Sequence, residues 1–426
     1  MSTHLHYEEL AMAFSTGGTG AGLDALIAAL RAGNDHHALF RALLLKKRHE
    51  LGLPLLNPAD LRGCPDSARA EYKAFVDSVC REVGARALGD GDIAQAWRYY
   101  GALGDAAPVR AALENLEPQQ ASDEVLAAAL AQGVHPQRGF QLTLERHGLD
   151  RALRLFETGF SPAFQDKQYA AALLVRTLYK ELVRGVCKAV LEKTGQLPGE
   201  TDLVELVRGR TWLFEGAKVH ADAQAVIAIS RIGLLCEARE DLIMSLCISE
   251  YGRLLETPHH PPSLPLFEAG YQDHARFARA LLGESADETV DYFRNKLYTY
   301  HGSSDTFPAE MVMLLYWRLG RKDDALDIWQ QHLSWQPPEK PGAVVPSFYE
   351  LCLEAQDFSR LSDIARTQDD VAAWAAAQIM ESRAADSAAP VPLSADSASV
   401  PLSAGNAPPP PASLPAPTSD AGQDLS

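Results

Sequence analysis

Three carboxylates lie about one helical turn apart in the run Asp323-Asp324-Ala325-Leu326-Asp327. On a helix this spacing brings carboxylate oxygens together, and hard oxygen ligands are those that Mg²⁺ prefers. The same residues also suit the start of an ordinary helix, because acidic side chains in the first turn interact favourably with the helix dipole. The run therefore supports two hypotheses, a metal-binding active site and the first turn of a structural helix.

The run resembles the DDxxD motif of all-helical prenyltransferases and terpene synthases, which use it to hold Mg²⁺ on a diphosphate. That resemblance implies a second acidic cluster on the other side of a cavity. The only other pair of adjacent aspartates, Asp369-Asp370, is followed by Val-Ala-Ala-Trp. Because a short motif has little specificity, the structural interpretation is favoured, and we expect neither a metal nor another cofactor.

Other motifs with chemical potential are weaker. The glycine-rich segment 15–26 precedes a helix, whose N-terminus can bind anions, but no strand precedes it and no Lys-Ser/Thr follows it. The thirteen histidines form no HExxH motif and, with the six cysteines, no zinc-binding spacing. A GxSxG nucleophile motif is also missing. The sequence thus predicts a protein that is not an enzyme.

Charge and composition restrict the partners. The 426 residues include 39 basic and 56 acidic ones, for a net charge of −17, which repels phosphate backbones and argues against nucleic acid as the main partner. No stretch approaches the roughly 18 apolar residues of a membrane span, and the N-terminus resembles no secretory signal. With unpaired cysteines in apolar patterns, these features predict a cytoplasmic protein that binds neither nucleic acid nor membrane.

Helical periodicity dominates from about Gly22 to Ala377. Apolar residues recur at steps of three and four, and alternating β-branched runs are almost absent. Gly, Pro and Asn-Pro interrupt the pattern, so the helices are short and their connections are short. Such helices pack as antiparallel hairpins, and an all-α fold is therefore predicted.

One complete hairpin surrounds Gly320. Its second helix contains Ala325 and Trp329 and is followed by Pro337, while Tyr316 lies in the first helix. These residues resemble the tetratricopeptide repeat (TPR), in which an Ala, an aromatic residue four positions later and a Pro after the helix recur at fixed places. A small residue lets the two helices approach closely, and the aromatic ring fills the gap to the next hairpin.

The layout repeats along the chain. Turns at Gly283, Gly320 and near Gln356 lie 37 and 36 residues apart. A single hairpin cannot bury its apolar face alone, so neighbouring hairpins must stack. The resemblance, clearest over 266–376 and weaker over 90–260, implies a right-handed α-solenoid of stacked helical hairpins.

The expected domain organisation follows the changes in pattern along the chain. It comprises a flexible leader (1–19), N-terminal helical hairpins (20–163), a long helix with central helices (164–260), TPR-like repeats (261–380) and a disordered tail (384–426). The tail is rich in Pro, Ala and Ser and repeats VPLSA at 391–395 and 400–404. Such a chain cannot bury enough apolar surface to offset its ordering entropy. A polyproline-type ligand is the alternative to an unspecific flexible tail.

The stretch from Phe164 to Lys193 predicts one long amphipathic helix, because it has no Pro and only one Gly. Basic side chains recur every four residues, opposite the apolar stripe: Arg176, Lys180, Arg184 and Lys188. They form either a docking face, for an acidic peptide or another part of this chain, or a solvated face paired with Glu181 and Glu192. The solvated face is favoured, since charge runs on helices usually face solvent.

TPR arrays bind extended peptides or helices on their concave face, mainly through residues of each first helix. The resemblance implies that this groove is lined by Glu310, Leu314 and Arg318 in one repeat and by Glu350 and Glu354 in the next. The predicted function is a scaffold or adaptor for protein or peptide partners, with self-association as a further possibility. The alternatives are an all-helical metal-dependent enzyme that uses Asp323–Asp327 and a helical regulator that senses a small ligand.

Overall fold

The computed structural model describes residues 7–55, 65–158, 160, 163–256, 259–300, 305–340, 342 and 344–388. Within these ranges the chain forms 18 α-helices and three short 3₁₀ helices, and no strand. An isolated bridge joins Leu264 and Phe267. The all-α prediction is confirmed, whereas nearly all of the predicted tail, from residue 389, lies outside the described residues.

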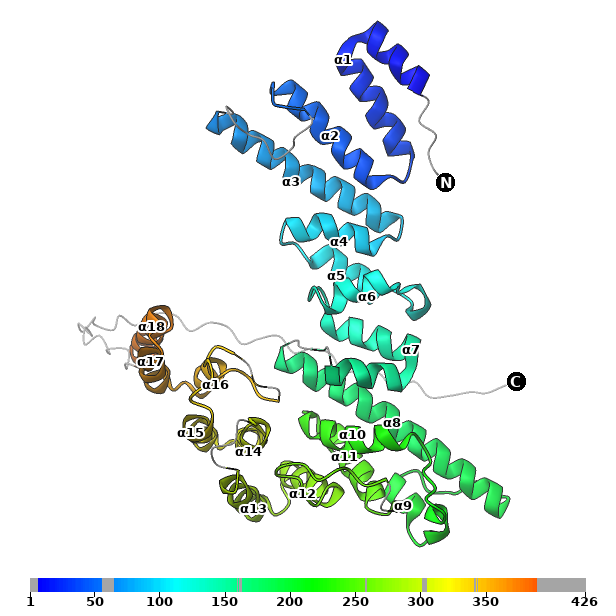
Figure 1. The fold of residues 1–426 in the computed structure, drawn as a ribbon, viewed down its shortest axis with the longest axis vertical. Helices are drawn as coiled ribbons and strands as arrows, with labels where there is room; N and C mark the ends of the chain where they lie inside the picture. The colour runs from blue at the N-terminus through cyan, green and yellow to red at the C-terminus, as the bar shows by residue number, and fades with distance from the viewer. Residues whose placement is uncertain are drawn as a thin grey trace, which may run out of the picture.

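The N-terminal helices form a column in which each helix packs on the next or next-but-one helix along the chain (Figure 1). They are α1 (Tyr7–Ala32), α2 (His36–Glu50), α3 (Asp66–Gly89), α4 (Ile93–Ala102), α5 (Ala107–Glu114) and α6 (Asp123–Leu130). Aspartate side chains cap two of these helices: Asp35 accepts a hydrogen bond from Ala38 N, and Asp92 accepts one from Gln95 N. Such caps fix where each short helix begins.

The start of the chain requires a correction. The flexible leader expected over residues 1–19 is helical from Tyr7 onward, because α1 begins there. The helix is interrupted at Gly18, whose positive φ of 76° suits glycine. A Cβ on Gly22 would lie 2.3 Å from the Phe14 ring. Phe14 thus packs on the second part of the helix, a contact that the Gly-rich composition did not reveal.

The remaining helices begin with α7 (Pro136–Thr158), which is interrupted at Gly148, and α8 (Phe164–Thr194). They continue with α9 (Leu203–Val207), α10 (Ala223–Ile232), α11 (Arg239–Gly252), α12 (Tyr271–Leu281), α13 (Ala286–Tyr298), α14 (Phe307–Arg318), α15 (Lys322–His332), α16 (Phe348–Ala355), α17 (Phe358–Thr367) and α18 (Val371–Ala388). Short 3₁₀ helices lie at Pro118–Gln120, Thr211–Phe214 and Gly233–Leu235.

The long helix α8 agrees with the prediction for Phe164 to Lys193 almost to the residue. It ends at Gly195, which adopts a left-handed conformation and donates a backbone hydrogen bond to Leu191 O. Its predicted apolar stripe is buried along its whole length: Leu178, Leu182, Val186 and Val190. The four basic residues on the other side are exposed, so the predicted amphipathic pattern is confirmed.

The hairpin around Gly320 also forms as predicted. Gly283, Gly320 and Gln356, the three predicted turn positions, all have positive φ, of 92°, 76° and 58°. Ala325 is fully buried in the helix pair, and the Trp329 ring stacks on Phe348 of the following helix with centroids 4.0 Å apart. The predicted roles of the small residue and of the aromatic residue are both confirmed.

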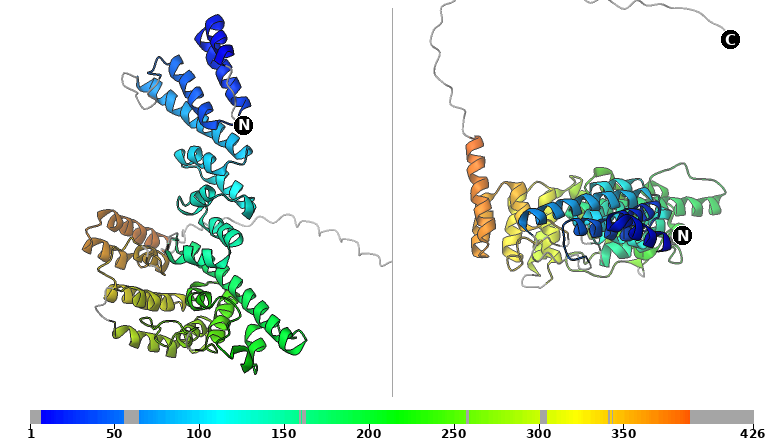
Figure 2. Two further views of the ribbon diagram at one scale, coloured as in Figure 1. Left: turned by 45° about the vertical axis from the view of Figure 1, so that its right-hand side comes forward. Right: turned by 90° about the horizontal axis from the view of Figure 1, so that it is seen from above.

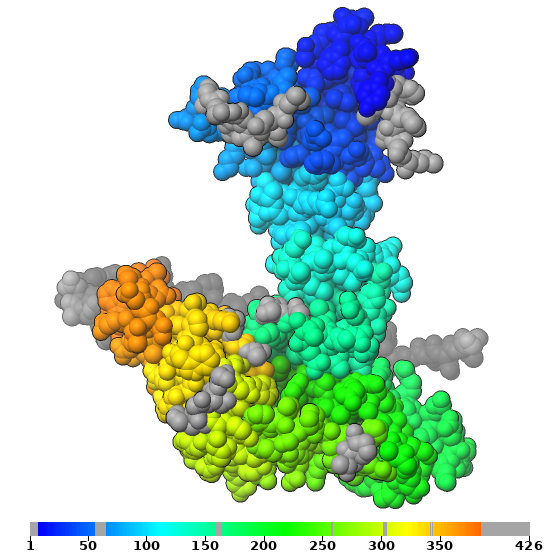
Figure 3. All heavy atoms as spheres, in the orientation of Figure 1, coloured from blue at the N-terminus to red at the C-terminus, as the bar shows by residue number. Residues whose placement is uncertain are grey.

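The chain changes direction at α8. Helices α9 to α18 follow an arc that brings α16 back towards the start of α8 (Figures 1 and 2). The space-filling view shows the N-terminal helices rising from this broader C-terminal part (Figure 3). One hydrophobic cluster runs through the arc, from Phe140 to Ala377, and α8 contacts α7, α9, α10 and α11 within it.

Candidate functional site

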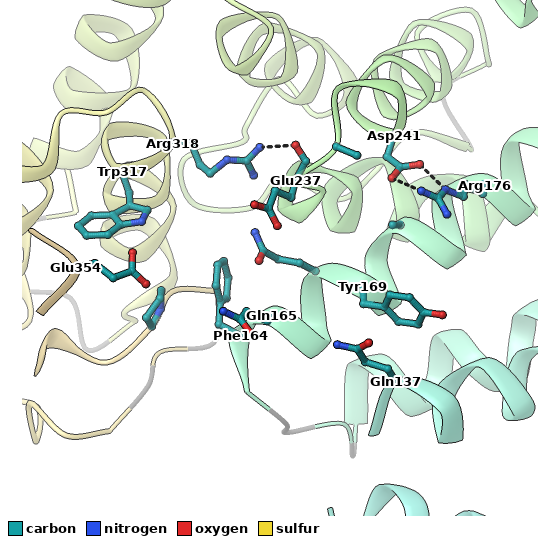
Figure 4. Close-up of a pocket in the computed structure, with 14 residues that line it drawn as sticks. Gln137, Phe164, Gln165, Tyr169, Arg176, Glu237, Asp241, Trp317, Arg318 and Glu354 are labelled. Atoms are coloured by element: carbon teal, nitrogen blue, oxygen red, sulfur yellow. Dashed lines mark hydrogen bonds and ion pairs between the residues drawn. The ribbon is translucent and has the colours of Figure 1, made fainter. Parts of the chain in front are cut away.

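A cleft of about 700 Å³ lies where the arc returns towards α8 (Figure 4). Its walls come from α7, α8, the start of α11, α14 and α16. The lining residues are Gln137, Phe164, Gln165, Gln168, Tyr169, Ala172, Arg176, Glu237, Ala238, Asp241, Trp317, Arg318, Pro346 and Glu354. Segments more than 100 residues apart in the sequence thus share one site.

Three aromatic rings and three primary amides are among the fourteen residues that line the cleft. Phe164, Tyr169 and Trp317 are partly buried, so each presents part of a ring to the cleft. Figure 4 shows Trp317 and Glu354 across the cleft from Tyr169. Rings give flat apolar contact area, and amides both donate and accept hydrogen bonds. The combination suits a ligand with alternating apolar groups and peptide groups.

One wall is fixed by an ion pair between α8 and α11. Arg176 donates from Nε to Asp241 Oδ1 at 2.6 Å and from Nη2 to Asp241 Oδ2 at 2.9 Å. The Asp241 side chain is only 2% exposed, while that of Arg176 is 49% exposed. The hydrogen bond to Asp241 raises the pKa of Arg176. The bidentate pair keeps a buried carboxylate satisfied and leaves one face of the guanidinium open to the cleft.

A second arginine lies deeper in the site. Arg318 on α14 donates from Nη1 to Cys236 O at 2.8 Å and from Nη2 to Glu237 O at 3.3 Å. Burial lowers the pKa of Arg318. Both of its described bonds go to backbone carbonyls, which carry no charge, so its positive charge persists in the cleft beside the exposed carboxylates of Glu237 and Glu354.

A second depression, of about 510 Å³, adjoins the cleft. It is lined by Arg110, Gly133, Val134, His135, Pro136, Gln137, Ala163 and Asp166. Gln137 belongs to both linings, and its Nε2 donates to Asp166 Oδ1 at 2.8 Å. Gln137 therefore lies between the two depressions, which are lined by residues from α5, α7 and α8 on one side and from α7, α8, α11, α14 and α16 on the other.

Three of the nine predicted binding residues line the cleft, namely Arg176, Arg318 and Glu354. The rest of the basic stripe lies elsewhere on the exposed side of α8. Lys188 Nζ is 3.9 Å from a Glu192 carboxylate oxygen, in a pair with both side chains exposed. This pair agrees with the solvated-face interpretation, although the role of Lys180 and Arg184 in binding stays a prediction.

The other predicted groove residues are used differently. Leu314 is fully buried and Glu310 is 2% exposed. Glu310 Oε2 accepts a hydrogen bond from Val344 N at 3.0 Å, which ties α14 to the segment before α16. Glu350 forms a capping box with Ser347 at the start of α16. The TPR resemblance placed all three on the groove. In this structure Leu314 packs in the core, and the two glutamates hydrogen-bond to nearby backbone.

The DDxxD run faces solvent. Asp323, Asp324 and Asp327 are exposed, and Asp327 Oδ1 accepts a hydrogen bond from Arg360 Nη1 at 2.8 Å. The second aspartate pair forms a turn, in which Asp370 Oδ1 accepts from Ala373 N. Across the described ranges, no group of three or more His, Cys, Asp or Glu side chains is arranged to hold a metal ion. Asp323 and Asp324 lie in the first turn of α15, and Asp370 caps the start of α18.

Sequence reasoning missed most of the cleft. Phe164, Gln165 and Tyr169 were seen only as the first turns of an amphipathic helix, and Trp317 only as part of a hairpin. Periodicity shows which side of a helix is polar but not which distant helix faces it. The available indication was local: Trp317 precedes Arg318, a residue that the TPR resemblance did place on the groove.

No protein-family model, curated protein or solved structure matches this chain. In the part of the chain that the structure describes, every helix is too short or too polar to cross a bilayer. The geometry of the cleft is therefore the basis for the function proposed next.

Proposed function

We propose that this protein is a scaffold or adaptor that binds an extended peptide segment of a protein partner in the cleft between α7–α8 and α14–α16. The observation that carries the proposal is the lining of this cleft, which combines partly buried Phe164, Tyr169 and Trp317 with the side chains of three glutamines, Gln137, Gln165 and Gln168. Extended peptides present free backbone groups on both edges and side chains at regular intervals. The amides match the free backbone groups, and the aromatic rings, which lie on both walls, match the side chains.

We also propose that the helices form a right-handed α-solenoid of TPR-like hairpins. The nearly equal spacing of the turns at Gly283, Gly320 and Gln356 supports this assignment, as does the stacking of Trp329 on Phe348 between successive hairpins. Solenoids of helical hairpins create extended concave surfaces because each repeat is rotated slightly relative to the last. The cleft occupies such a concavity.

A cytoplasmic location belongs to the same proposal. Cys236, Cys247 and Cys352 are free and buried, and burial raises the pKa of each thiol to about 12. Thiols held in this way are packing groups with little reactivity. Free buried cysteines are typical of proteins from reducing compartments.

Selection from a phage-displayed library of random 12-residue peptides tests the proposed function. Full-length wild-type protein should enrich a set of peptides, and Trp317→Ala should lose their binding by about tenfold or more, as for an aromatic anchor worth over 1.4 kcal/mol. Trp335→Ala is the matched control, because Trp335 is 62% exposed and lies outside the cleft. Enriched peptides that bind Trp317→Ala and wild type equally would refute a peptide site in the cleft.

A further inference from the structure

We infer that the cleft receives the chain's own Pro-rich segment, residues 389–426, so that this segment occupies the site until a partner displaces it. The inference rests on the proposed function, because it names one occupant of the proposed peptide site. It assigns the cleft a regulatory property, competition between an internal ligand and an external one.

The chemistry of the cleft matches a Pro-rich ligand. A polyproline II segment has no internal hydrogen bonds, so its backbone carbonyls need donors from the binding site. Proline rings pack against aromatic side chains, as in the known grooves for such segments. The cleft offers rings from Phe164, Tyr169 and Trp317, together with N–H donors from the Trp317 indole and the exposed Gln165 amide.

The sequence of the segment supplies the matching groups. It contains PPPP at 408–411, two copies of VPLSA and a Leu-Pro-Ala-Pro run at 414–417. Each copy of VPLSA places Val and Leu on either side of a proline, which gives two equivalent short ligands. The segment has no Lys or Arg and includes Asp396, Asp420 and Asp424, so an acidic side chain next to a VPLSA copy can approach Arg318.

The position of the segment allows it to reach the cleft. It follows α18, which packs on α17, which in turn packs on α16, and α16 contributes Glu354 to the lining. An extended Pro-rich chain covers about 3.1 Å per residue, so 38 residues can span on the order of 100 Å. Attachment to the same chain gives an effective ligand concentration in the millimolar range for a short flexible linker. Even a weak intrinsic affinity then fills the site.

Competition in the full-length protein tests the inference. The probe is a fluorescently labelled synthetic peptide of residues 389–426, followed by fluorescence anisotropy. The acceptors are the full-length wild type and a full-length variant in which every proline from Pro390 to Pro417 is replaced by Ser. The variant should bind the probe at least about tenfold more tightly, because its own segment no longer competes. Equal affinities, or no binding to either acceptor, would overturn the inference.

Two substitutions in the Pro→Ser variant locate the binding. Trp317→Ala removes an aromatic anchor. Gln165→Glu removes an amide donor and sets a negative charge against the acidic segment, at an exposed position of the lining where folding should tolerate it. Both should lower probe affinity by about tenfold or more, and Trp335→Ala should leave it unchanged. Probe binding that survives both cleft substitutions would place the segment elsewhere and overturn the assignment.

Sedimentation of wild-type protein over a range of concentrations shows whether the segment binds the cleft of its own chain or the cleft of a second copy. A monomer at all concentrations agrees with occupancy within one chain. A concentration-dependent dimer that disappears in the Pro→Ser variant would make a second copy the acceptor and contradict the internal occupant. If random peptides bind through Trp317 while the 389–426 probe does not, the inference fails and the proposed function stands. If neither binds, both fail.

Discussion

The two parts of the molecule bury their apolar side chains in different ways. In α1–α6, the described residues form several small clusters, each drawn from at most four consecutive helices, and one of them includes Leu142 of α7. From α7 to α18, one cluster extends from Phe140 to Ala377. The same kind of short helix therefore builds a column in one part and a curved, continuous core in the other.

The difference follows from the long helix. α8 contacts four other α-helices, including α10 and α11, which lie more than 25 residues further along the chain. Such contacts make the stability of the C-terminal part cooperative, whereas a column held by neighbour contacts opens in pieces. A cleft also needs walls from distant segments, and only a chain that turns back on itself supplies them. We therefore expect function in the arc and local opening in the column.

The largest expected effect comes from Trp329→Ala. Trp329 is 5% exposed and stacks on Phe348, so its removal leaves a cavity between successive hairpins. We expect a loss of about 3–5 kcal/mol in the free energy of unfolding, measured by urea denaturation. Hydrogen exchange should accelerate throughout the region from Phe140 to Ala377 and stay at wild-type rates in α1–α3.

The matched variant in the column is Tyr100→Ala. Tyr100 is 6% exposed and packs so closely on α3 that a Cβ on Gly84 would lie 2.8 Å from its ring. Faster exchange should remain within α3–α6 and their contacts. If either variant accelerated exchange in both parts equally, the comparison between column and arc would be wrong.

Arg176→Ala should have the next largest effect, because it leaves the buried Asp241 carboxylate without its bidentate partner. We expect a loss of about 1.5–3 kcal/mol of stability. Lys180→Ala removes the next basic residue of the same stripe and, being exposed, should change stability by no more than about 0.5 kcal/mol. Thermal unfolding of both variants checks this, and equal effects would show that the stripe acts as one electrostatic unit.

Acidification should weaken the arc through His274. Burial lowers the pKa of His274 to about 3, from an ordinary value near 6.5. Below pH 6.5 the unfolded chain binds a proton that the folded protein excludes, so this contribution to stability falls as pH falls. It is fully retained above pH 6.5, and about 2 kcal/mol is lost by pH 5. Urea denaturation at pH 7 and pH 5 measures the loss.

The control for this prediction is His274→Leu, which removes the titrating group. Its partner Ser230 still donates to Ile227 O at 2.8 Å, so the substitution leaves that hydroxyl satisfied. The variant should lose about 2 kcal/mol less than wild type between pH 7 and pH 5. An unchanged pH dependence would mean that other groups account for the acid sensitivity of the arc.

The smallest expected effect concerns the repeated turn. Gln356 adopts a φ of 58° at a place where the two preceding helical hairpins have Gly283 and Gly320. Gln356→Gly should relieve left-handed strain and increase stability by about 0.5–1 kcal/mol, after the greater flexibility of glycine in the unfolded chain is taken into account. Gly320→Gln should have the opposite sign. Differential scanning calorimetry of the two variants would reveal whether the turns are equivalent.

Local features of the fold were predictable from the sequence. The limits of α8, the turns at Gly283 and Gly320 and the burial of Ala325 all follow from short-range patterns, because periodicity and turn chemistry act within one or two helices. The first helix was missed for the converse reason. A glycine such as Gly18 indicates the end of a helix in the sequence. In the structure it permits Phe14 to pack on Gly22 within one interrupted helix.

The candidate site was predictable only in part. Arg318 and Glu354 follow from the expected groove of a hairpin stack, and both line the cleft. Glu310 was assigned to the same groove, yet it turns inward to bond Val344 N. The opposite wall, with Phe164 and Tyr169, depends on how far the arc curves. That curvature is the sum of many small packing angles, which a single sequence does not specify.

A photoreactive benzoylphenylalanine at Gln165 in the full-length protein tests the account most directly, because Gln165 is exposed and lines the cleft. Cross-linked peptides identified by mass spectrometry should join this position to the segment around Pro346–Glu354 and to residues 389–426. The same group at Lys188, on the solvent side of α8, should give neither product. Cross-links from position 165 that remained within α7 and α8 would contradict both the closed arc and its internal ligand.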